Sequence, residues 1–117
     1  MTIADIGNIL NGTIVCGENF DREVHNACGS DMMSDVLAYV KEQSVLLSGL
    51  VNSQVVRTAE MMDMVCIVFV RGKQPTQEMI DLANERGIVL MTTPYRMFTA
   101  CGLLYVNGLG GGETVRE

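Results

Sequence analysis

The chain has 117 residues, of which 48% are hydrophobic and 19% charged, and its formal net charge is −6. This composition indicates one globular domain with a real core and excludes an intrinsically disordered chain. The eight basic residues are spread thinly along the chain and form no basic cluster, which argues against a nucleic acid polymer as a partner. A single nucleotide remains a candidate ligand, because backbone N–H groups can hold one phosphate.

The hydrophobic pattern changes period several times along the chain, which is typical of alternating helices and strands. Thr2 and Asp5 have the spacing of a capping box, which predicts a helix at the very start. The predicted elements are, in chain order, a helix to about Leu10, strands over 13–16 and 23–29, a helix after Ser30 or Asp31, a strand over 45–51, a helix after Asn52 or Ser53, a strand over 65–70, a helix over 76–86, a strand over 88–91 and a helix that ends near 107–108.

The run Val65–Val70 is apolar at every position, as expected of a strand that is covered on both faces. Gly87 lies where a glycine commonly ends a helix, and Thr93 followed by Pro94 is typical of a helix N-cap with proline at the first helical position. Because strands and helices alternate with short connections, we expect a single three-layer α/β domain over residues 1–109, with a mostly parallel sheet of about five strands flanked by helices. Residues 110–117 hold glycines and charges and are expected to form a flexible tail.

The four cysteines are Cys16, Cys28, Cys66 and Cys101, and no pair has C-x-x-C spacing. We expect reduced thiols and a cytoplasmic protein. The N-terminal residues lack the features of a signal peptide, and no apolar run reaches about 18 residues, as a membrane span requires. The slightly positive mean hydropathy favours a homo-oligomer that covers apolar surface with a copy of itself.

Three predicted loops follow the carboxyl ends of the predicted parallel strands, where ligands bind in open α/β sheets near a point at which the strand order reverses. Each loop precedes a helix whose first N–H groups are free to hold an anion such as a nucleotide phosphate. The candidate ligand-binding residues are Ser30, Asp31, Ser48, Gly49, Asn52, Arg71, Gly72, Thr92, Thr93 and Tyr95. The same residue types are also ordinary turn formers and helix caps, and the pattern leaves both interpretations open.

Catalytic and metal sites are not indicated by the sequence. His25 is the only histidine, and a general base needs a nucleophile or an orienting acid within reach. Asp31 and Asp35 lie one helical turn apart, where the helix dipole explains both carboxylates as well as acid–base chemistry would. One histidine and four dispersed cysteines do not make a zinc site, so we expect no metal and no cofactor.

Two blocks of the sequence, Val65–Pro75 and Ile88–Phe98, resemble the DRTGG domain, and residues 21–24 and 30–36 resemble its short stand-alone members. The resemblance covers about residues 2 to 107. It departs from the motif that names the family, because Leu50 and Val51 follow Gly49 where the family tends to carry Asp-Arg. Likewise, 70–72 is Val-Arg-Gly in place of Thr-Gly-Gly, so that Arg71 would supply a cation for an anionic ligand.

The resemblance implies a small α/β fold related to the N-terminal domain of HPr kinase. Such domains occur beside CBS pairs in some inorganic pyrophosphatases and at the front of some phosphotransacetylases, where the role is regulatory and includes dimer contacts. Stand-alone members are similar to proteins encoded near iron-hydrogenase and electron-transfer genes.

Three functions follow from these observations. The first is a non-catalytic regulatory domain, homodimeric, that binds a nucleotide or small phosphorylated metabolite. The second is a protein-interaction adaptor for a hydrogenase-linked redox partner or a kinase, which needs only an exposed apolar patch, for example one rich in methionine. The third is a small enzyme that would use Asp31, His25 or Cys28, for which the sequence holds no motif.

Overall fold

A computed structural model of the chain describes residues 1–39 and 42–112. Within these ranges the chain forms five helices and five strands. In chain order they are α1 (Ile3–Ile9), β1 (Thr13–Cys16), β2 (Asn26–Gly29), α2 (Met33–Tyr39), β3 (Ser44–Ser48), α3 (Ser53–Met61), β4 (Cys66–Phe69), α4 (Gln77–Arg86), β5 (Val89–Thr92) and α5 (Met97–Val106). No helix in these ranges has both the length and the apolar character to cross a membrane.

The strands form one sheet in the order β1-β5-β4-β3-β2, in which β2 to β5 are parallel neighbours. The predicted three-layer α/β domain with a mostly parallel five-stranded sheet is confirmed. The edge strand β1 is the exception, because it runs antiparallel to β5 with Thr13 opposite Thr92. An antiparallel neighbour needs no crossover helix, and β1 reaches the sheet directly from α1.

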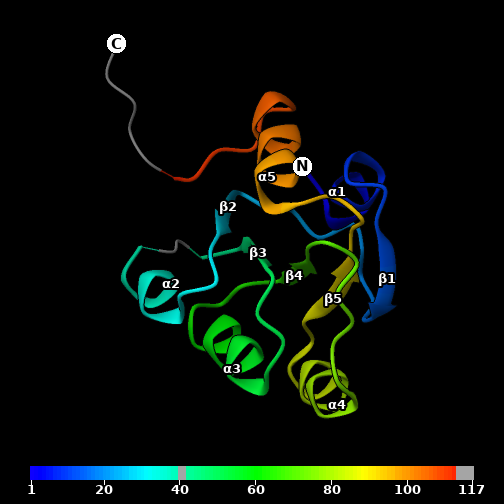
Figure 1. The fold of residues 1–117 in the computed structure, drawn as a ribbon, viewed down its shortest axis with the longest axis vertical. Coiled ribbons are helices and arrows are strands. Elements are labelled where there is room, and N and C mark those ends of the chain that lie inside the picture. Colours follow the sequence, from blue (N-terminus) through cyan, green and yellow to red (C-terminus); the bar gives the residue numbers. More distant parts are fainter. Residues whose placement is uncertain (40–41, 113–117) are drawn as a thin grey trace.

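Two hydrophobic cores lie on the two faces of the sheet, because successive side chains of a strand point to opposite faces. One core joins α1 and α5 to strand residues such as Leu47, Val68 and Met91. The other joins α2, α3 and α4 to strand residues such as Leu46, Ile67 and Leu90. Figure 1 shows this arrangement, with α1 and α5 above the sheet and α2, α3 and α4 below it.

The crossovers explain why three consecutive helices share one face. The steps from β2 to β3, β4 and β5 all run in one direction along the sheet, and crossovers of one hand then place α2, α3 and α4 on the same side. After β5 the chain passes over the edge of the sheet, and α5 packs on the opposite face. The loops after β4 and β5 therefore diverge.

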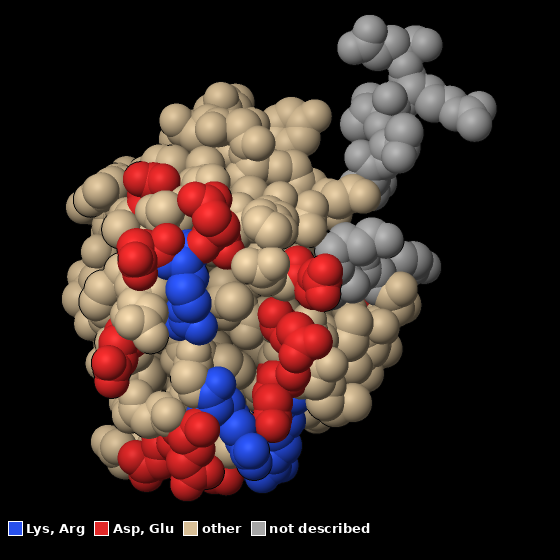
Figure 2. All heavy atoms as spheres, turned by 180° about the vertical axis from the view of Figure 1, so that it is seen from behind, with Lys and Arg blue, Asp and Glu red and all other residues tan. Residues whose placement is uncertain are grey.

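Charged side chains are unevenly placed on the surface. Seen from behind, acidic and basic residues cover much of the middle and lower part of the molecule (Figure 2). The topmost part, where α5 lies in Figure 1, shows none of them on this face.

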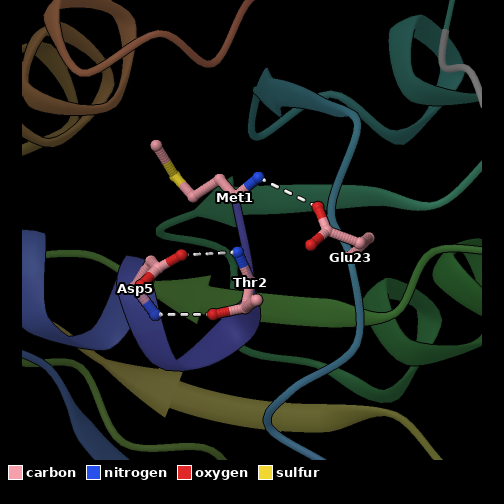
Figure 3. A network of polar contacts seen from close by, with 4 residues as sticks. All are labelled: Met1, Thr2, Asp5 and Glu23. Atoms are coloured by element: carbon pink, nitrogen blue, oxygen red, sulfur yellow. Dashed lines mark hydrogen bonds and ion pairs between the residues drawn. The ribbon is translucent and has the colours of Figure 1, made fainter.

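Local capping explains where several helices begin and end. Thr2 Oγ1 accepts a hydrogen bond from the N–H of Asp5 at 3.1 Å, and Asp5 Oδ2 accepts one from the N–H of Thr2 at 2.9 Å. Figure 3 shows this predicted capping box, which is confirmed. Gly87 ends α4 in the left-handed conformation with φ at 69°, as its position in the sequence predicted.

The predicted helix start at Thr93 is wrong. Thr93 is fully buried, and its Oγ1 donates to the carbonyl of Leu10 at 2.6 Å. α5 begins instead at Met97, with Arg96 at the N-cap and no side-chain capping bond. The hydroxyl that looked like a cap is used in a contact between residues 83 positions apart, which local sequence does not reveal.

The glycine-rich segment after α5 packs against the domain as far as Gly110. Leu109 is buried, and the carbonyl of Gly110 accepts a hydrogen bond from the N–H of Ala27 on β2 at 2.9 Å. Residues 113–117 of the predicted tail lie outside the described residues, so a flexible tail there stays a prediction.

Candidate ligand-binding site

The three loops that follow β3, β4 and β5 lie at one edge of the sheet, called here the rim. The N–H of Val70 donates to the carbonyl of Ser48 at 3.1 Å, which joins the first loop to the second. The N–H groups of Arg71 and Gly72 donate to the carbonyls of Tyr95 and Thr93, both at 2.8 Å, which joins the second loop to the third. The parallel strand direction thus brings together the segments that the sequence singled out.

The backbone of the rim fills the crevice that a diverging pair of loops would open. The loops after β4 and β5 lead to helices on opposite faces, which in parallel sheets creates a ligand crevice. Here the two bonds from Arg71 and Gly72 to the third loop bridge that gap. The exposed side chains of Arg71 and Lys73 both lie against Gly49.

Gly49 is the centre of a polar cluster made of Asp31, Ser48, Gly49, Arg71 and Lys73, called here the Gly49 cluster. Its N–H donates to Asp31 Oδ1 at 2.6 Å, and Ser48 Oγ donates to the same oxygen at 3.1 Å. Lys73 Nζ donates to the carbonyl of Gly49 at 3.0 Å. Both peptide groups of this glycine are therefore held by charged side chains.

The guanidinium of Arg71 lies close over Gly49. A Cβ atom at this position would lie 3.1 Å from Nη2 of Arg71 and 3.6 Å from both carboxylate oxygens of Asp31. A positive and a negative side chain thus flank the same buried glycine. No signal in the sequence paired these residues.

Several backbone N–H groups of the rim loops already have hydrogen-bond acceptors within the chain. Those of Arg71, Gly72 and Gly49 have the partners given above. The N–H of Leu50 donates to Ser48 Oγ at 3.1 Å, and that of Tyr95 donates to Thr93 Oγ1 at 3.3 Å. These N–H groups are therefore not available to an anion, whereas the side chains of Arg71 and Lys73 are exposed.

Several predicted site residues have structural partners in this fold. Asn52 caps α3 through a bond from the N–H of Gln54 to Oδ1 at 3.0 Å. Ser30 Oγ accepts from the N–H of Met32 at 3.0 Å in a local turn. Thr92 and Thr93 are buried, with 6% and 0% of their surface exposed. Tyr95 is half-buried and Gly72 is exposed.

Arg71 and Lys73 are exposed cations of the loop after β4, and Arg96 is a further exposed cation at the end of the loop after β5. Lys73 was part of the predicted loop but not of the predicted site, because its contact with Gly49 spans 24 residues. Arg71 adopts a left-handed backbone with φ at 59°, which costs a residue with a Cβ roughly 1–2 kcal/mol. Strain of this kind gathers at functional positions.

The cysteine thiols are poor nucleophiles in this environment. Burial raises the pKa of the Cys66 thiol to about 12. Burial also raises the pKa values of Cys16, Cys28 and Cys101 above the ordinary value. All four are unpaired, and they stay protonated at neutral pH, where a thiolate would be needed for attack.

A cavity of about 590 Å³ lies at the opposite, amino-terminal edge of the parallel strands. His25 is exposed there, between Glu23 and the start of β2. The carboxylates of this cavity have structural partners, since Glu23 binds the α-amino group of Met1 at 3.1 Å and Asp5 belongs to the capping box (Figure 3). Hydrogen bonds from Thr2 lower the pKa of the Asp5 carboxyl. Within residues 1–39 and 42–112, no group of three or more His, Cys, Asp or Glu side chains is placed to hold a metal ion.

Comparison with known proteins matches this chain to a family and to solved structures. The family model described as the DRTGG domain matches residues 5–105. The chain is similar, at 21% identity and a TM-score of 0.74, to the CBS and DRTGG domains of the regulatory region of Clostridium perfringens pyrophosphatase, crystallised with its activator diadenosine tetraphosphate. The likeness covers 88% of this chain and 45% of that one, so this chain spans less than half of that structure. At this identity it shows a common fold. No curated protein matches the sequence.

Proposed function

Because the chain belongs to the DRTGG domain family, we propose that it is a non-catalytic regulatory domain that binds a nucleotide or small phosphorylated metabolite at the Gly49 cluster. The observation that carries this proposal is the pair of exposed cations, Arg71 and Lys73, held against one buried glycine. Guanidinium and ammonium groups bind phosphate oxygens through charge-assisted hydrogen bonds. The half-buried ring of Tyr95, whose carbonyl bonds to Arg71, is a surface on which a base can stack.

A nucleotide is the first ligand class to test. The similar pyrophosphatase regulatory region was crystallised with a dinucleoside tetraphosphate as its activator. Of the two ligand classes, only a nucleotide would use the aromatic ring as well as the cations.

The arrangement of the reactive groups supports binding rather than chemistry. His25 and the carboxylates of Asp5 and Glu23 lie at the edge opposite the rim, while the cations lie at the rim. The thiols are protonated because burial raises their pKa values. The unpaired cysteines also support our proposal of a cytoplasmic protein, since thiols stay reduced there.

Thermal unfolding with diadenosine tetraphosphate, ATP and inorganic pyrophosphate as probes tests the proposal. A probe at 100 times its dissociation constant should stabilise the fold by about 2.7 kcal/mol. Arg71→Gly removes the cation and also the left-handed strain, so we expect the probe effect to vanish while the fold keeps its stability.

Arg86→Met is the matched control. Arg86 ends α4 at the opposite edge and makes a surface ion pair with Glu60 at 3.3 Å, which is worth little. This variant should respond to the probes like the unchanged protein. If a probe stabilised Arg71→Gly and the unchanged protein equally, the ligand would bind somewhere other than the Gly49 cluster. If none of the three probes stabilised the unchanged protein, the proposal would be wrong.

We also propose that the domain acts as a homodimer. Its slightly positive mean hydropathy and its exposed apolar side chains support this part of the proposal.

A further inference from the structure

The helix α5 leaves large apolar side chains in solvent. Phe98 is 90% exposed, Val106 78% and Tyr105 67%. None of the residues from 97 to 106 is charged, whereas a surface helix normally carries polar residues on its outer side. The exposed side forms a shallow groove of about 630 Å³, called here the α5 face, that is lined by Met97, Phe98, Cys101, Gly102, Tyr105 and Val106.

Gly102 in the middle of this helix has no role in packing within the chain. Apart from its two neighbours in the chain and the backbone of its own helix, no atom lies within 4 Å of the place where its Cβ would be. A glycine inside a helix weakens it relative to alanine, so a reason for it is expected. Close approach of another backbone to the α5 face supplies that reason.

The distribution of charge on the surface indicates which partner packs on the α5 face. Each copy of the chain has a net charge of −6, so two copies repel one another over most of their surface. No charged residue lines the α5 face, and the topmost part of the molecule shows none on the side seen in Figure 2. A second copy can therefore pack on the α5 face without burying an unpaired charge. The α5 face of that second copy is equally uncharged and so matches it.

We propose that the α5 face is the interface between two copies of the chain, with their α5 helices crossing antiparallel at Gly102 about a two-fold axis. Phe98 and Val106 each lie four residues from Gly102, which is about 6 Å along a helix. A two-fold axis at Gly102 therefore places Phe98 of one copy against Val106 of the partner subunit. A two-fold interface must match itself in this way. This inference rests on the homodimer that we propose above.

Sedimentation velocity of the full chain tests the interface. We expect the unchanged protein to be a dimer. The double variant Phe98→Glu with Val106→Glu should dimerise at least about 100-fold more weakly, because like charges would then face each other. The matched control is Met32→Glu with Met61→Glu, which changes two methionines that are 62% and 70% exposed elsewhere and should leave the dimer intact.

Gly102→Ala separates close approach from a structural role of the glycine. Alanine should raise the thermal stability of dilute, monomeric protein, because it favours the helix and meets no atom of the same chain. The same variant should weaken the dimer at least about tenfold, because the two helices meet at this position. Unchanged dimerisation of Gly102→Ala would overturn the crossing at Gly102.

Disulfide trapping tests the antiparallel arrangement. In a Cys101→Ala background, Phe98→Cys combined with Val106→Cys should form interchain disulfides under mild oxidation. Phe98→Cys alone should form few, because the two copies of residue 98 would lie about 12 Å apart along the helix axis. Efficient trapping by the single variant would overturn the antiparallel crossing.

The outcomes separate this inference from the proposal on which it rests. An unchanged protein that is monomeric at about 100 μM would end both the homodimer and the interface, and would leave the α5 face to a different protein. A dimer that both double variants leave intact, or that both disrupt equally, would end only the assignment of the α5 face.

Discussion

At the scale of single residues, Asp31 joins the end of β2 to the end of β3. Its Oδ1 accepts from the N–H of Gly49 at 2.6 Å and from Ser48 Oγ at 3.1 Å. Hydrogen bonds to a charged acceptor are stronger than neutral ones, and a buried donor that loses its partner is costly. The carboxylate therefore has a structural role at the rim besides any role toward a ligand.

We predict that Asp31→Ala lowers the free energy of unfolding by about 1–2 kcal/mol, measured by urea denaturation. Asp31→Asn should cost less, because the amide oxygen still accepts from Gly49. Asp35→Ala is the control, since Asp35 lies in the first turn of α2, where a carboxylate contributes less than about 1 kcal/mol. Equal losses for Asp31→Ala and Asp35→Ala would contradict the role of the Gly49 contact.

Cys66 links stability to pH, also at the scale of one residue. Burial raises its pKa from the ordinary value of 9.0 to about 12. The folded state therefore holds this proton more tightly than the unfolded state does. The resulting stability is fully present below about pH 9 and is lost as pH rises toward about 12.

We expect the difference in unfolding free energy between the unchanged protein and Cys66→Ala to be constant up to about pH 9 and to shrink above it. Other titrating groups cancel in this difference, while the loss of the sulfur atom adds a constant offset. Urea denaturation at a series of pH values measures it. If the difference in unfolding free energy stayed constant through pH 10, the pKa of Cys66 would be the same in the folded and the unfolded state.

At the scale of elements, the helix ends follow from local chemistry. Thr76 Oγ1 accepts from the N–H of Met79 at 3.2 Å at the start of α4, and Gly87 ends the helix with φ at 69°. Both features are visible in the sequence as a hydroxyl before the first turn and a glycine after the last. Such caps need only residues a few positions apart.

We predict that Gly87→Ala lowers the stability of the domain by about 1 kcal/mol, because alanine is strained in the left-handed region. Gly87→Asn should cost less, since asparagine tolerates that conformation. Asn84→Ala, at an exposed position inside α4, is the control and should change stability by less than about 0.5 kcal/mol. Thermal unfolding measures all three, and an unaffected Gly87→Ala would refute the role of the glycine.

At the scale of the whole molecule, the acidic surface and the uncharged α5 face make opposite contributions to association. Repulsion between two chains of charge −6 is screened by salt, whereas contact between apolar faces is not. The sign of the salt effect therefore reports what holds two copies together.

We predict that dimerisation strengthens as sodium chloride rises from about 20 to 300 mM, measured by sedimentation velocity. The variant Phe98→Glu with Val106→Glu should recover part of its lost affinity at high salt, because its added charges are screened as well. A dimer that dissociates on adding salt would show that ion pairs, and not the α5 face, hold it together.

The sequence by itself determined the elements and the direction of most strands. The apolar run 65–70, the capping box of Thr2 and Asp5 and the glycine at 87 act over a few residues, and alternation of strand and helix forces parallel neighbours. Parallel neighbours end at one edge, which is why the loops of the rim could be predicted to meet.

Only the tertiary structure decided how those loops are used. Asp31 and Gly49 lie 18 positions apart, Lys73 and Gly49 lie 24 apart, and Thr93 and Leu10 lie 83 apart, so no local pattern pairs them. Tertiary packing likewise decides the antiparallel direction of β1 and which side of α5 is exposed to solvent. A helix that is apolar all round shows no preferred face in its sequence, and the packing of α1 and the sheet selects which side is left in solvent.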